Sequence, residues 1–299
     1  MKQLLYKIIY SGFINSILTN FIKHVLPFLP RGLKLPPSGE ISFKVENGFI
    51  KMRTNQTNYL TYCVFWNGYK NFEYTPIFEK LVKKTNTFYD VGANIGYYSL
   101  LAAKINPNMK VKSFEPSTGP LHYLRENVAV NNFKNITVEP VALADKNGEI
   151  DFYEEKSPKY TYIKYNLAGE GNAGSKTSPE RFNKNTVKAI TFDDYLKQHP
   201  NDKVELMKMD TEGTEHYILK KAHVLLSEHK PLIICETLFN TIEKDLEEIL
   251  KPYGYEFYNH IETGLQKVDS IKRTTDNGVK NCFFVHPSKK YLIEEFITV

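Results

Sequence analysis

From residue 86 onward, short apolar runs alternate with helical patterns, and this alternation restricts the chain to a small group of folds. The apolar runs of strand length are 87–91, 111–114, 136–143, 206–209 and 232–235. The helical patterns between and after them are 97–104, 120–131, 214–227 and 242–250. Strands separated by helices pair in parallel, because each helix returns the chain to the same edge of the sheet. We therefore predict an α/β fold: a doubly wound, mainly parallel, Rossmann-like sheet.

The first 84 residues do not follow this alternation, and we predict that 1–84 form a helical and short-strand extension to a main domain at 85–299. Residues 41–66 alternate in the manner of strands, and Asn47-Gly48 is typical of a hairpin turn. A helix is expected over about 75–84. Near the other end of the chain, 255–258 and 282–285 are expected to form a closing pair of strands.

Residues 2–28 carry apolar side chains at helical spacing, with a break at Ser11-Gly12. They contain no run of 18 apolar residues, so no membrane-spanning helix is expected, and Lys7 interrupts any apolar core of signal type. Two interpretations remain: helices that dock on the main domain, or an interfacial helix that contacts a membrane. Docking is preferred because the polar face is only weakly basic.

The composition is ordinary for a globular protein, with 41% hydrophobic and 24% charged residues. The 39 basic residues are scattered and form no stripe, so a nucleic-acid partner is not expected. Cys63, Cys235 and Cys282 lie far apart without metal-ligand spacing, which favours reduced thiols and a cytoplasmic location. Nothing in the sequence indicates the oligomeric state.

The segment Asp90-Val91-Gly92-Ala93-Asn94-Ile95-Gly96 ends one predicted strand and opens the next helix. Gly92 and Gly96 permit a tight turn and let a ligand approach the backbone. A helix N-terminus also has free amide donors and the positive end of a dipole. We therefore predict that Gly92, Asn94 and Gly96 bind a ligand that carries a carboxylate or a phosphate.

The acid Glu115 ends the next predicted strand, 19 residues after Gly96. A carboxylate in that place accepts hydrogen bonds from the ribose hydroxyls of NAD or of S-adenosylmethionine. A dinucleotide needs the G-x-G-x-x-G spacing, whereas this turn has G-x-N-x-G after Asp90. Asp90 would repel a pyrophosphate but attract the ammonium of a methionine moiety. S-adenosylmethionine is therefore preferred, and an NAD-dependent oxidoreductase is the alternative.

Two further segments are candidates for ligand contacts. Ala142 follows the third predicted strand, where a small apolar residue could flank an adenine ring. Asp145 could accept a hydrogen bond from the adenine amino group, or cap the turn before Asn147-Gly148. The polar stretch 155–185 is long for a compact domain, which is typical of a lid, a binding loop or a disordered segment.

Three carboxylates follow the last two predicted strands. Asp210 ends one strand, Glu212 follows two residues later, and Glu236 ends the next strand. The carboxyl ends of parallel strands form the ligand-binding edge of such sheets. One of the three could act as a general base on a hydroxyl. A variant in which they hold Mg²⁺ is the alternative, while the preferred interpretation has no metal.

These motifs together resemble the FkbM family of methyltransferases. The match rests on Asp90–Gly96, Phe114-Glu115-Pro116, Asn172-Ala173-Gly174, Lys208–Gly213 and Pro231–Glu236, in that order along the chain. The resemblance implies a class I methyltransferase domain that uses S-adenosylmethionine. It also implies cofactor contacts at Asp90, Gly92, Asn94, Glu115 and Ala142, and it places Asp210 near the methyl group. Asn172 would belong to a loop that closes over the substrate.

Members of that family mostly methylate hydroxyls of sugars and small molecules, so the resemblance implies an O-methyltransferase with a glycan or small-molecule acceptor. The aromatic residue that stacks on a nucleobase in amino-methylating enzymes is missing from Asp210-Thr211-Glu212-Gly213. A non-catalytic module that binds the cofactor or a glycan is the alternative. It would be expected to lack Asp90, Glu115 or Asp210, and this chain has all three.

Overall fold

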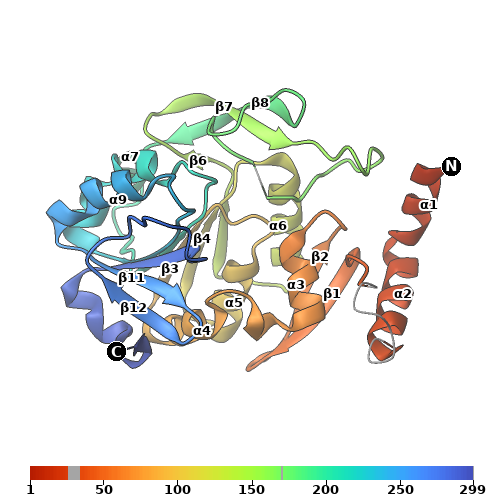
Figure 1. Ribbon diagram of the computed structural model, residues 1–299, viewed down its shortest axis with the longest axis horizontal. Helices are drawn as coiled ribbons and strands as arrows, with labels where there is room; N and C mark the ends of the chain where they lie inside the picture. The colour runs from red at the N-terminus through yellow and green to blue at the C-terminus, as the bar shows by residue number, and fades with distance from the viewer. Residues whose placement is uncertain (26–33, 170, 299) are drawn as a thin grey trace.

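The computed structural model describes residues 1–25, 34–169 and 171–298, and its centre is a sheet with the strand order β14-β12-β11-β13-β10-β9-β3-β4-β5 (Figure 1). Five neighbouring strands of this sheet run parallel to one another. They are β10 (Leu232–Glu236), β9 (Leu206–Met209), β3 (Thr87–Val91), β4 (Lys110–Phe114) and β5 (Ile136–Glu139). The predicted α/β fold with a mainly parallel sheet is confirmed.

The remaining strands extend the sheet beyond β10. These are β13 (Asn281–Val285), β11 (Glu256–Ile261), β12 (Gly264–Val268) and β14 (Ile297–Thr298). The expected pairing near the chain end is confirmed, because β11 and β13 run antiparallel with Glu256 opposite Val285. A separate sheet with the order β6-β8-β7 contains β6 (Ala142–Leu143), β7 (Gly148–Glu155) and β8 (Phe182–Ile190).

Both faces of the parallel strands are buried. Along β3, Phe88 joins one hydrophobic cluster and its neighbour Tyr89 joins a second one on the opposite face. This follows from strand geometry, in which successive side chains point to opposite sides. The first cluster is covered by α4 (Thr75–Lys84) and α5 (Tyr97–Ile105), and α6 (Thr118–Val130) contributes Leu124 to the buried core. The second is covered by α7 (Phe192–Gln198), α8 (Glu215–Leu219) and α9 (Glu243–Leu250).

Three predicted elements differ in the structure. The strand pattern expected to continue to residue 66 ends at Thr54, and α3 (Tyr59–Asn67) follows, because the Asn58 side chain accepts from the Thr61 amide (2.8 Å) and caps a helix there. The predicted strand 136–143 is divided between β5 and β6. The predicted helix 214–227 is wrong as one element, since α8 ends at Leu219 and a π-helical turn occupies Leu225–His229.

The N-terminal extension packs against the main domain through a hairpin. Its strands β1 (Gly39–Val45) and β2 (Gly48–Thr54) turn beside Asn47, so the hairpin predicted there is confirmed. Ile50 and Met52 are fully buried in the first hydrophobic cluster. Before the hairpin, α1 (Lys2–Ile9) and α2 (Gly12–Val25) form a rod at one edge of the molecule (Figure 1), with the expected break between them.

Candidate active site

A cavity of about 200 Å³ opens at the carboxyl ends of β9, β3 and β4. The residue or turn that follows each strand contributes to its wall: Asp210 after β9, Gly92 after β3 and Glu115 after β4. Because β3 lies between β9 and β4 in the sheet, the cavity extends along the sheet edge from one acid to the other. This is the edge at which sequence reasoning placed the site.

The backbone amides of residues 92–96 are not free as expected, because each already donates to a protein acceptor; ligand contacts at Gly92, Asn94 and Gly96 stay a prediction. The amides of Gly92 and Ala93 both donate to the Phe114 carbonyl at 3.0 Å, and the Gly96 amide donates to the Ala93 carbonyl at 2.8 Å. The Asn94 amide donates to Glu115 Oε2, and the Ile95 amide to Asn94 Oδ1, both at 2.8 Å. The amides of the turn are therefore all occupied, three of them by acceptors at the end of β4.

Gly92 and Gly96 are required by close contact between chain segments. Gly92 has φ +74°, and a Cβ there would lie 1.9 Å from the Asp210 carbonyl oxygen. Gly96 has φ +92°, and a Cβ there would lie 2.5 Å from Leu124 Cδ1 on α6. Gly92 and Asn94 belong to the cavity wall, whereas Gly96 packs behind it.

Glu115 lies at the β4 end of the cavity, where the ribose interpretation requires an acid. Its side chain is buried, and its two oxygens accept from the amides of Asn94 (2.8 Å) and Ser117 (2.9 Å). Each carboxylate oxygen keeps a second lone pair for a ligand hydroxyl. Burial raises the pKa of Glu115 to about 7, against the opposing effect of the two amides.

Asp90 lies behind the cavity wall and not in it, which corrects its predicted contact with a ligand ammonium. It is fully buried, and its Oδ2 accepts from Ser99 Oγ at 2.6 Å. Its Oδ1 has no hydrogen-bond partner within the described residues and lies 3.7 Å from Lys208 Nζ. Asp90 therefore acts on the site through Lys208.

Lys208 is a site residue that sequence reasoning missed. Its Nζ donates to the Gly92 carbonyl at 2.7 Å and lies 3.3 Å from Asp210 Oδ2. Burial opposes its charge, but Asp210, Asp90 and Glu73 outweigh that effect and raise the pKa of Lys208. A lysine in the middle of the buried strand β9 was the available signal, since buried lysines in central strands require partners.

Glu73 is a second residue whose place in the site was not predicted. Its carboxylate lines the cavity and accepts from Tyr98 Oη at 3.0 Å. It reaches solvent through the cavity mouth, yet surrounding protein atoms and the Asp210 charge raise its pKa. Its backbone has φ +43°, a left-handed conformation that is uncommon for glutamate. Glu73 thus adds a carboxylate to the cavity wall, in addition to Asp210 and Glu212.

The structure brings Asp210, Glu212 and Glu236 together as predicted. One carboxylate oxygen from each lies within 4.8 Å of the other two. Two lysines counter this charge: Lys208 beside Asp210, and Lys176, whose Nζ lies 2.7 Å from Glu212 Oε2. Three oxygen donors at this spacing could in principle hold a hard cation, but two of them already pair with an ammonium.

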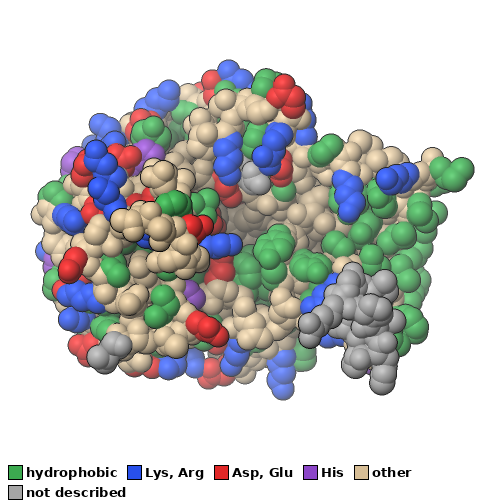
Figure 2. Space-filling model, in the orientation of Figure 1, with side chains coloured by type: hydrophobic (Ala, Val, Ile, Leu, Met, Phe, Trp, Pro, Cys, Tyr) green, Lys and Arg blue, Asp and Glu red, His purple; other side chains and the backbone are tan. Residues whose placement is uncertain are grey.

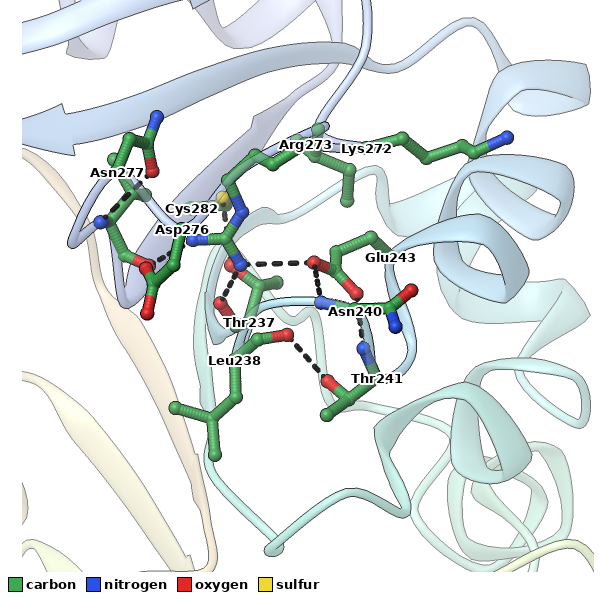
Figure 3. A network of polar contacts seen from close by, with 12 residues as sticks. Thr237, Leu238, Asn240, Thr241, Glu243, Lys272, Arg273, Asp276, Asn277 and Cys282 are labelled. Carbon is green, nitrogen blue, oxygen red and sulfur yellow. Dashed lines mark hydrogen bonds and ion pairs between the residues drawn. The ribbon is translucent and has the colours of Figure 1, made fainter.

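Glu236 lies next to the cavity rather than in its wall. Burial, followed by the charges of Asp210 and Glu212, raises its pKa to about 8. The loop after Glu236 is held by the buried Arg273, which donates to the Thr237 carbonyl at 2.6 Å and pairs with Glu243 at 3.0 Å (Figure 3). Glu243 in turn accepts from the amides of Asn240 and Thr241. This network fixes where β10 ends.

Ala142 and Asp145, the two candidates for contacts with the adenine, lie in different places in the structure. Ala142 is buried in the cavity wall with the apolar side chains of Phe114, Leu143 and Phe152, which suits a flat aromatic ligand. Asp145 is exposed and borders a different cavity. Of the two roles left open for Asp145, its position fits the turn before Asn147-Gly148.

The polar stretch between β7 and β8 crosses the cavity. Ala168, Gly169 and Ala173 line it, and Leu167 is tied to the start of α3 because its amide donates to Thr57 Oγ1 at 2.8 Å. Asn172 itself is buried, exchanges backbone hydrogen bonds with Tyr153, and accepts from the amides of Gly174 and Lys176 at 3.0 Å. It therefore holds the shape of the stretch without being part of the wall.

Comparison with known proteins identifies this arrangement. Residues 90–257, more than half of the chain, match the family described as the methyltransferase FkbM domain. The methyltransferase sdnD of Sordaria araneosa is 26% identical over 190 residues, which cover 56% of this chain and 72% of that protein.

Two solved structures are similar in fold. One is the methyltransferase FkbM from Methylobacillus flagellatus KT, with a TM-score of 0.43 and 17% identity; the match covers 76% of this chain but only 54% of that one. The other is a SAM-dependent methyltransferase from Agrobacterium tumefaciens, with a TM-score of 0.41 and 9% identity over 84% of this chain and 71% of that one. On the strength of the family match, the chain belongs to the FkbM methyltransferases, and its cofactor is S-adenosylmethionine.

Proposed function

We propose that this methyltransferase transfers its methyl group to a hydroxyl of a glycan or a small molecule. The observation that carries the proposal is the cavity itself, which joins Glu115, the acid predicted to bind the ribose, to two further carboxylates, Asp210 and Glu212, along one sheet edge. Carboxylates beside a reacting group are suited to accept a proton from a hydroxyl.

The wall of the cavity fits S-adenosylmethionine. Glu115 would accept from the ribose hydroxyls, and Ala142, Phe114 and Phe152 would flank the adenine ring. Glu73 would face the ammonium of the methionine moiety, which leaves Asp210 for the acceptor. When bound, the cofactor supplies an electrophilic methyl group. The closed turn at 92–96 supports this choice over NAD, because it has no amides left for a pyrophosphate.

The residues around Asp210 would orient the acceptor and take up its proton. In our proposal the Asp210 carboxylate, assisted by Glu212 or Glu236, would accept the proton of the acceptor hydroxyl as that oxygen takes the methyl group. The bond from the methyl carbon to the sulfonium sulfur would break, with S-adenosylhomocysteine as the leaving group. Lys208 holds Asp210 in place from inside the sheet. The segment 167–173 would exclude water from the site. Alignment of the two reactants supplies a large share of the rate enhancement in such reactions.

A transfer assay tests this function directly. The purified protein, incubated with S-adenosylmethionine carrying a labelled methyl group and a set of glycans and hydroxylated small molecules, is expected to label an acceptor at oxygen. Label on nitrogen or carbon alone would contradict the proposed acceptor class.

The same assay in EDTA is expected to show unchanged methyl transfer, because Lys208 and Lys176 counter the charge of the acidic cluster. Activity that EDTA abolishes and Mg²⁺ restores would favour the metal-assisted alternative.

Replacing Glu115 with alanine is expected to weaken cofactor binding about ten- to a hundredfold, since hydrogen bonds to a charged group contribute about 1.5–3 kcal/mol.

In the unmodified protein the affinity for the cofactor should fall about tenfold for each pH unit below 7. The Glu115 carboxylate, with a pKa of about 7, must be ionised to accept from both ribose hydroxyls. Calorimetry with S-adenosylhomocysteine measures both effects. Glu139→Ala is the matched control, as Glu139 ends the neighbouring strand β5 outside the cavity wall. Equal affinity of the Glu115 variant would refute the ribose role.

A further inference from the structure

The helix α2 buries Asn15, Thr19 and Ile22 against the domain and leaves large apolar side chains exposed on its outer face. Asn15 and Thr19 are 1% and 2% exposed, whereas Phe13, Ile17 and Phe21 are 80%, 55% and 64% exposed. The buried Asn15 accepts from the Ser38 amide at 2.7 Å and donates to the Pro36 carbonyl at 3.2 Å. The predicted docking therefore occurs, but it leaves the apolar face uncovered.

The same apolar face continues along α1. This helix has no buried residue, and Leu4, Leu5 and Ile8 are 64%, 54% and 47% exposed. Figure 2 shows these hydrophobic side chains gathered along the edge of the molecule formed by α1 and α2, with basic side chains among them. Contiguous exposed apolar surface of this kind marks an interaction site.

The charge of the same segment selects the partner. Residues 1–39 contain five basic residues and no acidic one, and the first acid is Glu40. The formal charge of the whole chain is +5, so this segment accounts for all of it and the remainder is neutral. The basic residues are Lys2, Lys7, Lys23, Arg31 and Lys34. Lys23 and Lys34 donate to Phe65 and Asn67 of the neighbouring helix α3, and Arg31 lies outside the described residues. Lys2 and Lys7 of α1 therefore supply the positive charge that an apolar helical surface needs to be complementary to an anionic lipid surface.

We propose that α1 and α2 bind the surface of an anionic membrane, lying in its interface with the apolar face inserted among the lipids. Within the described residues, the helices are all too short or too polar to pass through a bilayer. The contact is thus peripheral, and the domain sits on the buried side of α2 above the lipid. A second copy of the chain is the other conceivable occupant of this face, but like-charged segments would then have to meet.

Sedimentation of the full chain with vesicles tests the proposal. We expect binding to vesicles of equimolar phosphatidylcholine and phosphatidylglycerol, weaker binding to pure phosphatidylcholine, and loss of binding as salt screens the charges. Ile17→Ser with Phe21→Ser should weaken binding about a hundredfold by removing two apolar anchors. The matched control is Tyr217→Ser with Tyr291→Ser, two exposed aromatics elsewhere on the surface.

A set of lysine substitutions separates the electrostatic contribution to membrane binding from the apolar one. Lys2→Gln with Lys7→Gln should weaken binding about fivefold per lysine, while Lys134→Gln with Lys146→Gln, exposed lysines of the main domain, should change nothing. Equal binding of the Ile17/Phe21 variant and the control would overturn the proposal. So would a lipid-free dimer, seen by light scattering, that the Ile17/Phe21 variant converts to a monomer. Calorimetry with S-adenosylhomocysteine should give the same affinity for all these variants, which keeps the result independent of the methyltransferase site.

Discussion

Lys208→Met is expected to destabilise the protein by about 3–5 kcal/mol, the cost of removing one partner from a buried ion pair. Lys208 and Asp90 are 8% and 1% exposed at the side chain, and the lysine also donates to the Gly92 carbonyl. Its loss would leave the Asp90 carboxylate buried without a counter-charge. Denaturant unfolding followed by circular dichroism measures the free energy of unfolding.

The double variant Asp90→Asn with Lys208→Met gives a sharper test of the same pair. If the loss of stability comes from the unpaired, buried charge of Asp90, the double variant should be more stable than Lys208→Met alone. Lys267→Met is the control, because its pair with Glu256 is partly exposed and should contribute less than about 1 kcal/mol. A Lys208 variant no less stable than this control would show that the ion pair is not structural.

Asp210→Asn is expected to lower kcat by about 10²- to 10⁴-fold, the usual contribution of a general base or of its orienting effect. Asparagine keeps the shape of the side chain but accepts a proton poorly. Because the ribose and adenine ends of the cavity are untouched, the affinity for S-adenosylhomocysteine should stay nearly intact. Single-turnover methyl transfer and calorimetry on the same preparation separate the two effects.

Asp202→Asn is the control for this variant. Asp202 also pairs with a lysine, Lys112 at 2.8 Å, but it precedes β9 and so lies at the opposite edge of the sheet. Its replacement should reduce stability without changing kcat of the folded enzyme. Unchanged turnover in the Asp210 variant would remove this aspartate from the mechanism.

The fold was predictable because its main signal is local. Apolar runs of strand length, each followed by a helical pattern, require only side-chain periodicity and appear in the structure as β3, β4, β9 and β10. The positions of Glu115 and Asp210 at the cavity could also be predicted, since the carboxyl ends of parallel strands meet at one edge of the sheet. The family resemblance, now confirmed, rested on these same segments.

What the sequence did not reveal depends on contacts between distant segments. The role of Asp90 could not be read from its motif, because its partner Lys208 lies on another strand. The amides of residues 92–96 were expected to be free, since nothing local shows that the Phe114 carbonyl and the Glu115 carboxylate accept from them. The orientation of α2 was hidden for the same reason, because only the Ser38 and Pro36 partners make a buried Asn15 favourable.

The turn after β3, whose amides all donate to protein acceptors, also determines how ligand binding affects the rest of the molecule. A loop whose donors all have acceptors before the ligand arrives loses little conformational entropy on binding. The ordering cost must then fall on the segment between β7 and β8, which crosses the same cavity from the other side. Ligand occupancy should accordingly slow amide hydrogen exchange in residues 156–181 and leave the exchange of residues 92–96 almost unchanged.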